Sequence, residues 1–226
     1  MVINRPALRT VLFDLDGTLV DTAPDIAAAL NRVLIEQGQP ALAYEHIRPV
    51  VSHGSTALIE LAFGIAATDP AFIPLRDRFL NLYRDNLACA SDLFPGMAEV
   101  LATIEERGMR WGVVTNKPAW LTEPLLEQLG LSARCACIIS GDTIEQRKPH
   151  PAPMLLACER SGCEPGHCVY IGDAQRDVQA GKNAGMQTLV ALFGYLAEDD
   201  TPETWGADAL LENPAAVLAW LDQNAD

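Results

Sequence analysis

The feature that most constrains this 226-residue chain is the segment Asp14-Leu15-Asp16-Gly17-Thr18, which directly follows the apolar run Val11-Leu12-Phe13. The apolar run predicts a buried strand over 11–15, so Asp14 and Asp16 would lie at or just beyond its C-terminal end. Ligands bind at that edge in open α/β sheets. Buried carboxylates cost free energy unless they are paired or bind a metal. The pair therefore indicates a divalent cation and a nucleophilic role for at least one carboxylate.

Composition describes a globular chain with a sizeable core and argues against large anionic partners. Hydrophobic residues make up 49% and charged residues 20%, which fits one domain, or one domain with a smaller one inserted. The formal net charge of −14 predicts no nucleic-acid partner and no membrane partner, because both require basic patches. A small phosphorylated metabolite is compatible with this negative charge, since a cation and a few basic side chains can make one site positive.

The cysteines and the N-terminal segment predict a reduced, cytoplasmic protein. Residues 1–10 are of mixed polarity, and Asp14 and Asp16 interrupt the first apolar run, so no signal segment is expected. No stretch is apolar enough to span a bilayer. We expect the six cysteines to be reduced and mostly buried, because neither their spacing nor a secretory context supports zinc or disulfides. They are Cys89, Cys135, Cys137, Cys158, Cys163 and Cys168.

Strand and helix patterns alternate along most of the chain. Amphipathic segments separate the strand candidates, and several of these segments end on a glycine, as helices often do. The last helix is expected to open at Asn213-Pro214. This alternation predicts an α/β fold, a Rossmann-like doubly wound parallel sheet with helices on both faces. The expected strands are 10–13, 111–115, 136–139, 169–171 and 188–191.

One long interval, residues 23–92, breaks the alternation because it holds no strand pattern. Apolar residues recur there at helical spacing three times, for example over 26–34, 58–63 and 75–83. Proline and glycine at Pro24, Pro95 and Gly96 mark the two connections to the rest of the chain. We therefore expect a helical bundle at 23–92 inserted into an α/β core made of 1–22 and 93–226.

Three further segments carry chemistry of the same kind as Asp14 and Asp16. Thr115 and Asn116 follow a strand and precede a helix, so a hydroxyl, an amide and free helix N–H groups could meet a phosphoryl oxygen. Lys148 stands before a proline, which restricts its backbone, and its ammonium suits a site between a carboxylate and a phosphate. Taken singly, Thr115 and Asn116 are better explained as an ordinary helix cap and Lys148 as a solvated surface lysine.

The last of these segments again ends an apolar strand in a carboxylate. Asp173 follows Tyr170-Ile171-Gly172, and Asp177 comes one helical turn later. Asp173 is placed to complete an oxygen-rich Mg²⁺ site with Asp14 and Asp16. We expect Asp177 to orient neighbours such as Lys148 from behind the site. An N-cap aspartate with a partner in the first turn is the simpler alternative.

Together and in this order, the four segments resemble the motifs of the haloacid dehalogenase-like superfamily of phosphatases. The resemblance covers nearly the whole chain, and the helical interval is similar to that superfamily's mobile cap domain. It implies a phosphomonoester hydrolase in place of a haloacid dehalogenase, a receiver domain or a non-catalytic binding protein. The matching motifs are Asp14-Leu15-Asp16-Gly17-Thr18, Thr115-Asn116, Lys148-Pro149 and Gly172-Asp173 with Asp177.

The resemblance also implies a mechanism and a cofactor. Asp14 would attack phosphorus to form an aspartyl-phosphate, and Asp16 would protonate the leaving alcohol and later deprotonate water. Mg²⁺ would be held by the Asp14 and Asp173 carboxylates and by the Asp16 main-chain carbonyl. The phosphoryl oxygens would be held by Thr115, Asn116 and Lys148.

The substrate is expected from the branch of the superfamily that the chain resembles most, the phosphoglycolate phosphatases. A related branch acts on N-acetylmuramic acid 6-phosphate, and a phosphomutase of the same fold would keep all the motif residues. Specificity is expected to come from the inserted helices, where the small polar loop 51–56 is the candidate to face the site. In or near this loop, His53 or Arg48 could meet a second anionic group of the substrate, although His53 as an ordinary loop residue is as good an interpretation.

Overall fold

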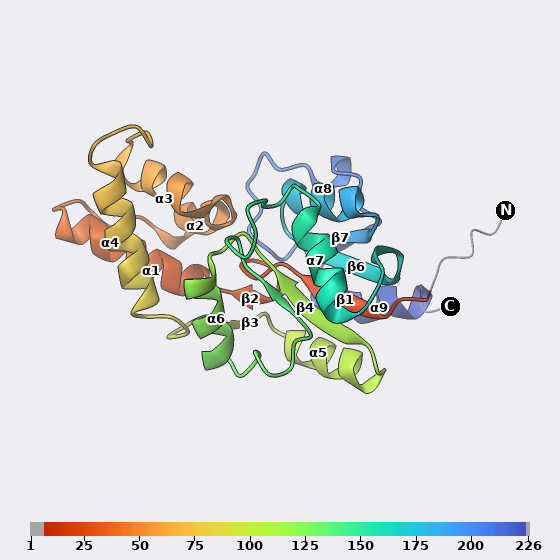
Figure 1. Ribbon diagram of the computed structural model, residues 1–226. Helices are drawn as coiled ribbons and strands as arrows, with labels where there is room; N and C mark the ends of the chain where they lie inside the picture. Colours follow the sequence, from red (N-terminus) through yellow and green to blue (C-terminus); the bar gives the residue numbers. More distant parts are fainter. Residues whose placement is uncertain (1–6, 225–226) are drawn as a thin grey trace.

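The centre of the protein is a six-stranded sheet, in a computed structural model that describes residues 7–224 (Figure 1). The strand order is β5-β4-β1-β6-β7-β8, and every neighbouring pair is parallel. The predicted Rossmann-like parallel sheet is therefore confirmed. Its strands are β1 (Thr10–Phe13), β4 (Arg110–Val114), β5 (Ile138–Ile139), β6 (Cys168–Gly172), β7 (Gln187–Ala191) and β8 (Ala209–Leu211).

Helices cover both faces of this sheet, because successive side chains of a strand point to opposite faces. Leu12 packs with residues of α7 and α8 on one face, whereas Val11 and Phe13 pack with residues of α5, α6 and α9 on the other. Both faces are thus buried, as the continuous apolar strands require. The helices are α5 (Met97–Glu106), α6 (Ala119–Gln128), α7 (Ala152–Ser161), α8 (Gln175–Ala184) and α9 (Ala216–Gln223).

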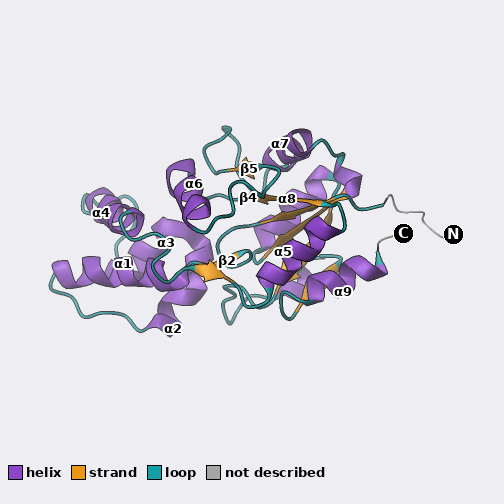
Figure 2. Ribbon diagram, turned by 90° about the horizontal axis from the view of Figure 1, so that it is seen from below, coloured by secondary structure: helices purple, strands orange, loops and turns teal. Residues whose placement is uncertain are grey.

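A group of four helices is inserted between β1 and β4 and lies beside the sheet (Figures 1 and 2). The chain enters it through β2 (Val20–Asp21) and returns through β3 (Asp92–Leu93), and these two short strands pair antiparallel. Within the group, α1 packs against α2, α3 and α4. The helices are α1 (Ala23–Glu36), α2 (Tyr44–Ile47), α3 (Gly54–Phe63) and α4 (Phe72–Arg84), with the 3₁₀ helix η1 (Arg48–His53) before α3.

The first inserted helix is anchored at its N-terminus by the core. The Tyr195 hydroxyl accepts hydrogen bonds from the main-chain N–H groups of Thr22 (2.7 Å) and Ala23 (2.9 Å), and it donates to Asp21 Oδ1 (2.7 Å). The tyrosine thus satisfies N–H groups that a helix start leaves unpaired. Asp25 anchors the returning chain in the same way, since its carboxylate accepts hydrogen bonds from the N–H groups of Ala90 and Ser91.

Some expectations about local structure need correction. Strand β8 carries no strong strand pattern and was not expected. The last helix begins at Ala216, beyond the expected opening at Asn213-Pro214, because one turn precedes it. Asn213 still acts as a capping residue, since its Oδ1 accepts a hydrogen bond from Ala216 N (3.2 Å). Strand β5 keeps only the last two residues of the expected segment 136–139, Ile138 and Ile139.

All six cysteines are free, as expected, but only three of them are buried. Two short 3₁₀ helices, η2 (Pro165–His167) and η3 (Pro202–Thr204), complete the connections. Within residues 7–224, no helix has both the length and the apolar character needed to cross a membrane.

Candidate active site

Asp14 lies directly beyond the C-terminal end of β1, where the parallel strands open toward the inserted helices. Its backbone N–H donates to Ile171 O of the neighbouring strand (2.8 Å), so the residue continues the sheet register. The side chain is 4% exposed, and its Oδ1 accepts a hydrogen bond from Leu15 N (2.7 Å). Such burial requires a positive partner, because an unpaired carboxylate is strongly disfavoured in the interior.

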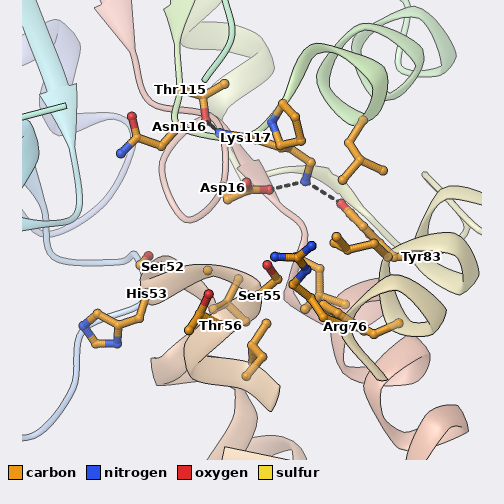
Figure 3. A pocket seen from close by; sticks show the side chains of 18 of the residues that line it. Asp16, Ser52, His53, Ser55, Thr56, Arg76, Tyr83, Thr115, Asn116 and Lys117 are labelled. Carbon is orange, nitrogen blue, oxygen red and sulfur yellow. Dashed lines mark hydrogen bonds and ion pairs between the residues drawn. The ribbon is translucent and has the colours of Figure 1, made fainter. Parts of the chain in front are cut away.

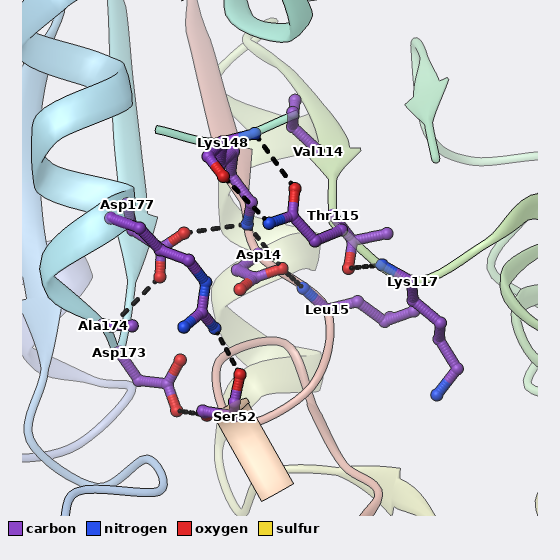
Figure 4. A network of polar contacts seen from close by, with 12 residues as sticks. Asp14, Leu15, Ser52, Val114, Thr115, Lys117, Lys148, Asp173, Ala174 and Asp177 are labelled. Carbon is purple, nitrogen blue, oxygen red and sulfur yellow. Dashed lines mark hydrogen bonds and ion pairs between the residues drawn. The ribbon is translucent and has the colours of Figure 1, made fainter. Parts of the chain in front are cut away.

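Lys148 supplies that positive partner. Its Nζ lies 2.9 Å from Asp14 Oδ1 and 2.8 Å from Asp177 Oδ1, and it donates to the Tyr170 hydroxyl (2.8 Å) (Figure 4). The Lys148 side chain is 1% exposed. The alternative of a solvated surface lysine is therefore wrong. All three ammonium protons have partners, so the lysine is held in place beside the Asp14 carboxylate.

Asn116 and Thr115 follow β4, and the structure gives the two side chains different contacts. The Asn116 amide grips the main chain of Lys148, donating from Nδ2 to its carbonyl (3.1 Å) and accepting from its N–H at Oδ1 (3.0 Å). Asn116 thereby fixes the main-chain position of Lys148. The hydroxyl of buried Thr115 accepts from Lys117 N (3.2 Å), and both residues line the cavity described below.

Asp16 is held by two side chains, those of Thr22 and Lys117, that were not among the predicted site residues. Its Oδ1 accepts hydrogen bonds from the Thr22 hydroxyl (2.6 Å) and from Lys117 Nζ (2.8 Å) (Figure 3). Lys117 Nζ also donates to the hydroxyl of Tyr83 on α4 (2.7 Å). Burial disfavours the ammonium, but Asp16 and Tyr83 outweigh it and raise the pKa of Lys117 above its usual range. Lys117 therefore stays charged and joins Asp16 to the inserted helices.

Asp173 follows β6 and faces Asp14. Its Oδ2 accepts hydrogen bonds from Tyr195 N (2.9 Å) and from the Ser52 hydroxyl (2.7 Å), whereas Oδ1 is buried and has no hydrogen-bond partner. Burial and the charges of Asp14 and Asp177 raise the pKa of Asp173 to about 7. An unpaired buried oxygen among like charges is the arrangement that a cation would stabilise.

The acidic side chains fit a divalent metal. Oxygen atoms of Asp14, Asp173 and Asp177 lie within 4.8 Å of one another. Asp177 already binds Lys148 through Oδ1 and accepts a hydrogen bond from Ala174 N through Oδ2 (3.0 Å). Asp14 and Asp173 are therefore the carboxylates that remain for the metal, and such hard oxygen donors suit Mg²⁺.

Gly17 makes the close approach of the two loops possible. Its φ is +79°, and a Cβ atom there would collide with Asp173 Oδ2 and with the ring of Tyr195. Only glycine combines this backbone conformation with the absence of a side chain. The loop after β1 can thus pack directly on the Asp173 carboxylate.

The family model for "haloacid dehalogenase-like hydrolase" matches residues 11–191, which include Asp14, Asp16, Lys148, Asp173 and Asp177. This chain is a haloacid dehalogenase-like hydrolase. A phosphoglycolate phosphatase of Xanthomonas campestris pv. campestris is 47% identical over 217 residues, covering 94% of this chain and 97% of that protein. An N-acetylmuramic acid 6-phosphate phosphatase of Pseudomonas aeruginosa is 39% identical over 221 residues, covering 98% of both chains.

A solved structure agrees with this assignment. The crystal structure of a predicted phosphoglycolate phosphatase from Haemophilus somnus 129PT superposes with a TM-score of 0.83 at 27% identity. It covers 94% of this chain and 97% of that chain. The match extends over the sheet and the inserted helices alike, so the whole hydrolase has the architecture of this family.

A cavity of about 640 Å³ opens in this hydrolase between the site and the inserted helices. Asp14, Asp16 and Thr115 line it from the core, and the loop 51–56 lines it from the other side (Figure 3). The loop that was expected to face the site therefore does so. His53 lines the cavity, although the residue is exposed.

Arg48, the other residue expected near a substrate, makes contacts elsewhere. Its guanidinium donates to the main-chain carbonyls of Phe193 and Gly194 (3.0 Å each) and stacks on the ring of Tyr195, with 4.9 Å from Cζ to the ring centroid. It is not among the residues that line the cavity. Arg48 thus joins the inserted segment to the core.

Proposed function

We propose that this protein is a Mg²⁺-dependent phosphomonoester hydrolase that works through an aspartyl-phosphate on Asp14. The observation that carries the proposal is the environment of the Asp14 carboxylate. Lys148 lies 2.9 Å away, and Asp173, whose Oδ1 is buried and unpaired, belongs to the same acidic cluster. A phosphoryl group there would meet a nucleophile with positive charge beside it, which favours in-line displacement.

Asp14 attacks the phosphorus atom, and the bond to the leaving alcohol oxygen breaks as the new bond forms. Asp16 gives the leaving oxygen a proton, and in the second step it takes one from the water that hydrolyses the aspartyl-phosphate. Thr22 and Lys117 both bind Asp16 through Oδ1, so Oδ2 is the oxygen available for these proton transfers.

The metal would be held by the carboxylates of Asp14 and Asp173 and by the main-chain carbonyl of Asp16. When bound, Mg²⁺ supplies positive charge that offsets the repulsion between the anionic carboxylate and the anionic phosphate. The buried orphan oxygen of Asp173 supports this assignment. Asp177 has the positioning role of holding Lys148.

Removing divalent cations is expected to stop phosphate release, since the carboxylates of Asp14 and Asp173 would then repel the anionic substrate without a metal ion between them. Phosphate release from a monoester should fall to background with EDTA and return when Mg²⁺ is added in excess. Ca²⁺ added in place of Mg²⁺ is the matched control, because its longer and more flexible coordination should not restore the rate. Full activity in EDTA would contradict the metal site.

We further propose that residues 23–92 act as a cap domain over a core domain of residues 1–22 and 93–226. The contacts across the cavity support this division. Tyr83 and Ser52 of the inserted segment bind Lys117 and Asp173 of the core. A cap joined to the core by the β2–β3 pair could close over the substrate and exclude water.

For the substrate, we propose 2-phosphoglycolate, which is hydrolysed to glycolate and phosphate. Relatives of that name are 47% identical to the chain over nearly its full length. The second candidate is N-acetylmuramic acid 6-phosphate, the name carried by the relative at 39% identity. The cavity favours it, since about 640 Å³ exceeds the needs of a two-carbon acid, and the exposed Trp120 lines it, offering a flat apolar surface to a sugar ring.

A direct comparison of the two esters tests this proposal. We expect kcat/KM for 2-phosphoglycolate to exceed that for N-acetylmuramic acid 6-phosphate by at least about tenfold, or about 1.4 kcal/mol of transition-state discrimination. The reverse preference would assign the second substrate. Detection of an isomeric phosphate ester in place of inorganic phosphate would identify a phosphomutase of the same fold.

A further inference from the structure

The cavity concentrates positive charge in a chain that is strongly acidic. Four of the 16 lysine and arginine residues line it, although the formal net charge is −14. The two that lie closest to the acidic site are already engaged: Lys117 binds Asp16 and Tyr83, and Arg176 donates to Ser52 O (2.7 Å). The other two are Arg76 and Arg147. Among the residues lining the cavity within 7–224, Arg76 is the one lysine or arginine that comes from the inserted helices.

Arg76 projects from α4 into the cavity, opposite the loop that carries Asp16 (Figure 3). Its Nε is buried without a hydrogen-bond partner. Its other recorded contacts are to a neighbouring carboxylate, Asp77 Oδ1 at 3.2 Å, and to the ring of Phe72, whose centroid lies 6.0 Å from Cζ. The side chain as a whole is 34% exposed, so a ligand in the cavity can reach the guanidinium although Nε itself is covered. An anionic acceptor there would gain a charge-assisted hydrogen bond.

The surroundings of Arg76 suit an anionic group with two oxygens, such as a carboxylate, more than a neutral group. The planar guanidinium presents two parallel N–H donors that match the two oxygens of a carboxylate. The hydroxyls of Ser55 and Thr56 line the same cavity and can donate further hydrogen bonds. Apolar side chains complete this wall, and they strengthen an ion pair by excluding water. They include Ile26, Leu58, Phe79 and Leu80.

We propose that Arg76 is the specificity-determining residue that binds a carboxylate on the leaving group of the phosphate ester. The inference rests on the phosphatase function proposed above and deepens it, because it assigns the substrate class as phosphate monoesters of carboxylic acids. Both 2-phosphoglycolate and N-acetylmuramic acid 6-phosphate belong to that class. Arg48 is excluded from this role, since its guanidinium already binds the carbonyls of Phe193 and Gly194.

Two matched pairs of esters test the inference. 2-Phosphoglycolate is compared with 2-hydroxyethyl phosphate, and N-acetylmuramic acid 6-phosphate with N-acetylglucosamine 6-phosphate; the second member of each pair lacks the carboxylate. For the better acid substrate, Arg76→Met should lower kcat/KM about 100-fold, chiefly through KM, because a charged hydrogen bond is lost. For the carboxylate-free partner of that substrate, the kcat/KM of Arg76→Met should stay within about twofold of the wild-type value. Arg76→Lys should restore only part of the loss, because an ammonium lacks the two-pronged geometry.

Arg78→Met is the control on the same helix. Arg78 pairs with Glu36 (2.8 Å), its side chain is 49% exposed, and it does not line the cavity. For each pair of esters, the ratio of kcat/KM for the acid to kcat/KM for its carboxylate-free partner should therefore remain at the wild-type value. Thermal unfolding of each variant separates a folding defect from a loss of recognition. An equal loss on both members of a pair, or no loss on the acid, would overturn the role of Arg76. Wild-type protein that releases no phosphate from any of the four esters would instead overturn the proposed function itself.

Discussion

Asp14→Asn is expected to abolish turnover and leave the fold intact. Asparagine has the same shape, and its Oδ1 can still accept the hydrogen bonds from Leu15 N and Lys148 Nζ that the carboxylate accepts now. An amide oxygen cannot form the acyl phosphate, so we expect kcat to fall by at least about 10⁴-fold, as for loss of a covalent nucleophile. Phosphate release and thermal unfolding, measured on the same preparation, check both halves of this prediction.

Asp222→Asn is the matched control, because Asp222 makes a surface ion pair with Arg107 on the far side of the core and its side chain is 63% exposed. It should leave kcat unchanged. An Asp14→Asn variant with ordinary kcat would show that another group attacks phosphorus. Loss of folding in that variant would show that the charge of Asp14, and not only its shape, is required by Lys148.

Lys148→Met is expected to damage both stability and activity. Methionine keeps most of the apolar stem but removes the ammonium that lies between Asp14 and Asp177. Breaking a buried pair leaves an uncompensated charge, so the free energy of unfolding should fall by about 3–5 kcal/mol. Phosphate release should fall by about 10³-fold, because positive charge at the phosphoryl group stabilises the transition state. Urea unfolding and steady-state kinetics measure the two effects.

A second substitution separates these effects. In Lys148→Met/Asp177→Asn, one of the two carboxylates left without a partner becomes neutral, so part of the stability should return while phosphate release stays low. Lys182→Met is the control for removing a lysine, since Lys182 is exposed and donates only to Gly206 O. Recovery of activity in the double variant would show that Lys148 serves only to neutralise Asp177, and the phosphate-binding role would be wrong.

The motif residues could be predicted because each follows an apolar strand directly. Parallel strands end at one edge, so Asp14, Thr115 and Asp173 meet there once the strands pair. Lys148 was harder to predict, because only its partners distinguish a buried lysine from an exposed one. Asn116 shows the limit of such reasoning: its position was predicted, but its side chain binds the main chain of Lys148.

Contacts between the core and the inserted helices could not be predicted from the sequence. Lys117 follows Asn116 and looks like a solvated residue, yet it bonds Asp16 and Tyr83 because α4 packs across the site. The different contacts of Arg48 and Arg76 were equally unpredictable. Both are arginines of the inserted segment, and only the packing shows that one binds the core and the other faces the cavity. Strand β8 was missed because its three residues carry too little pattern.

The pairing of β2 with β3 has a consequence for how such enzymes diversify. Val20 lies opposite Leu93 and Asp21 opposite Asp92, so the sheet domain meets the whole interval between them as one long hairpin loop. The entropy lost on closing a loop grows only with the logarithm of its length, so exchanging this interval for a shorter or longer one would change core stability little. An evolving lineage, or a protein engineer, could therefore graft a new substrate pocket at this junction while the strands that carry Asp14, Thr115 and Asp173 stay in place. The hydrogen bonds that now join Ser52 to Asp173 and Lys117 to Tyr83 would have to be rebuilt.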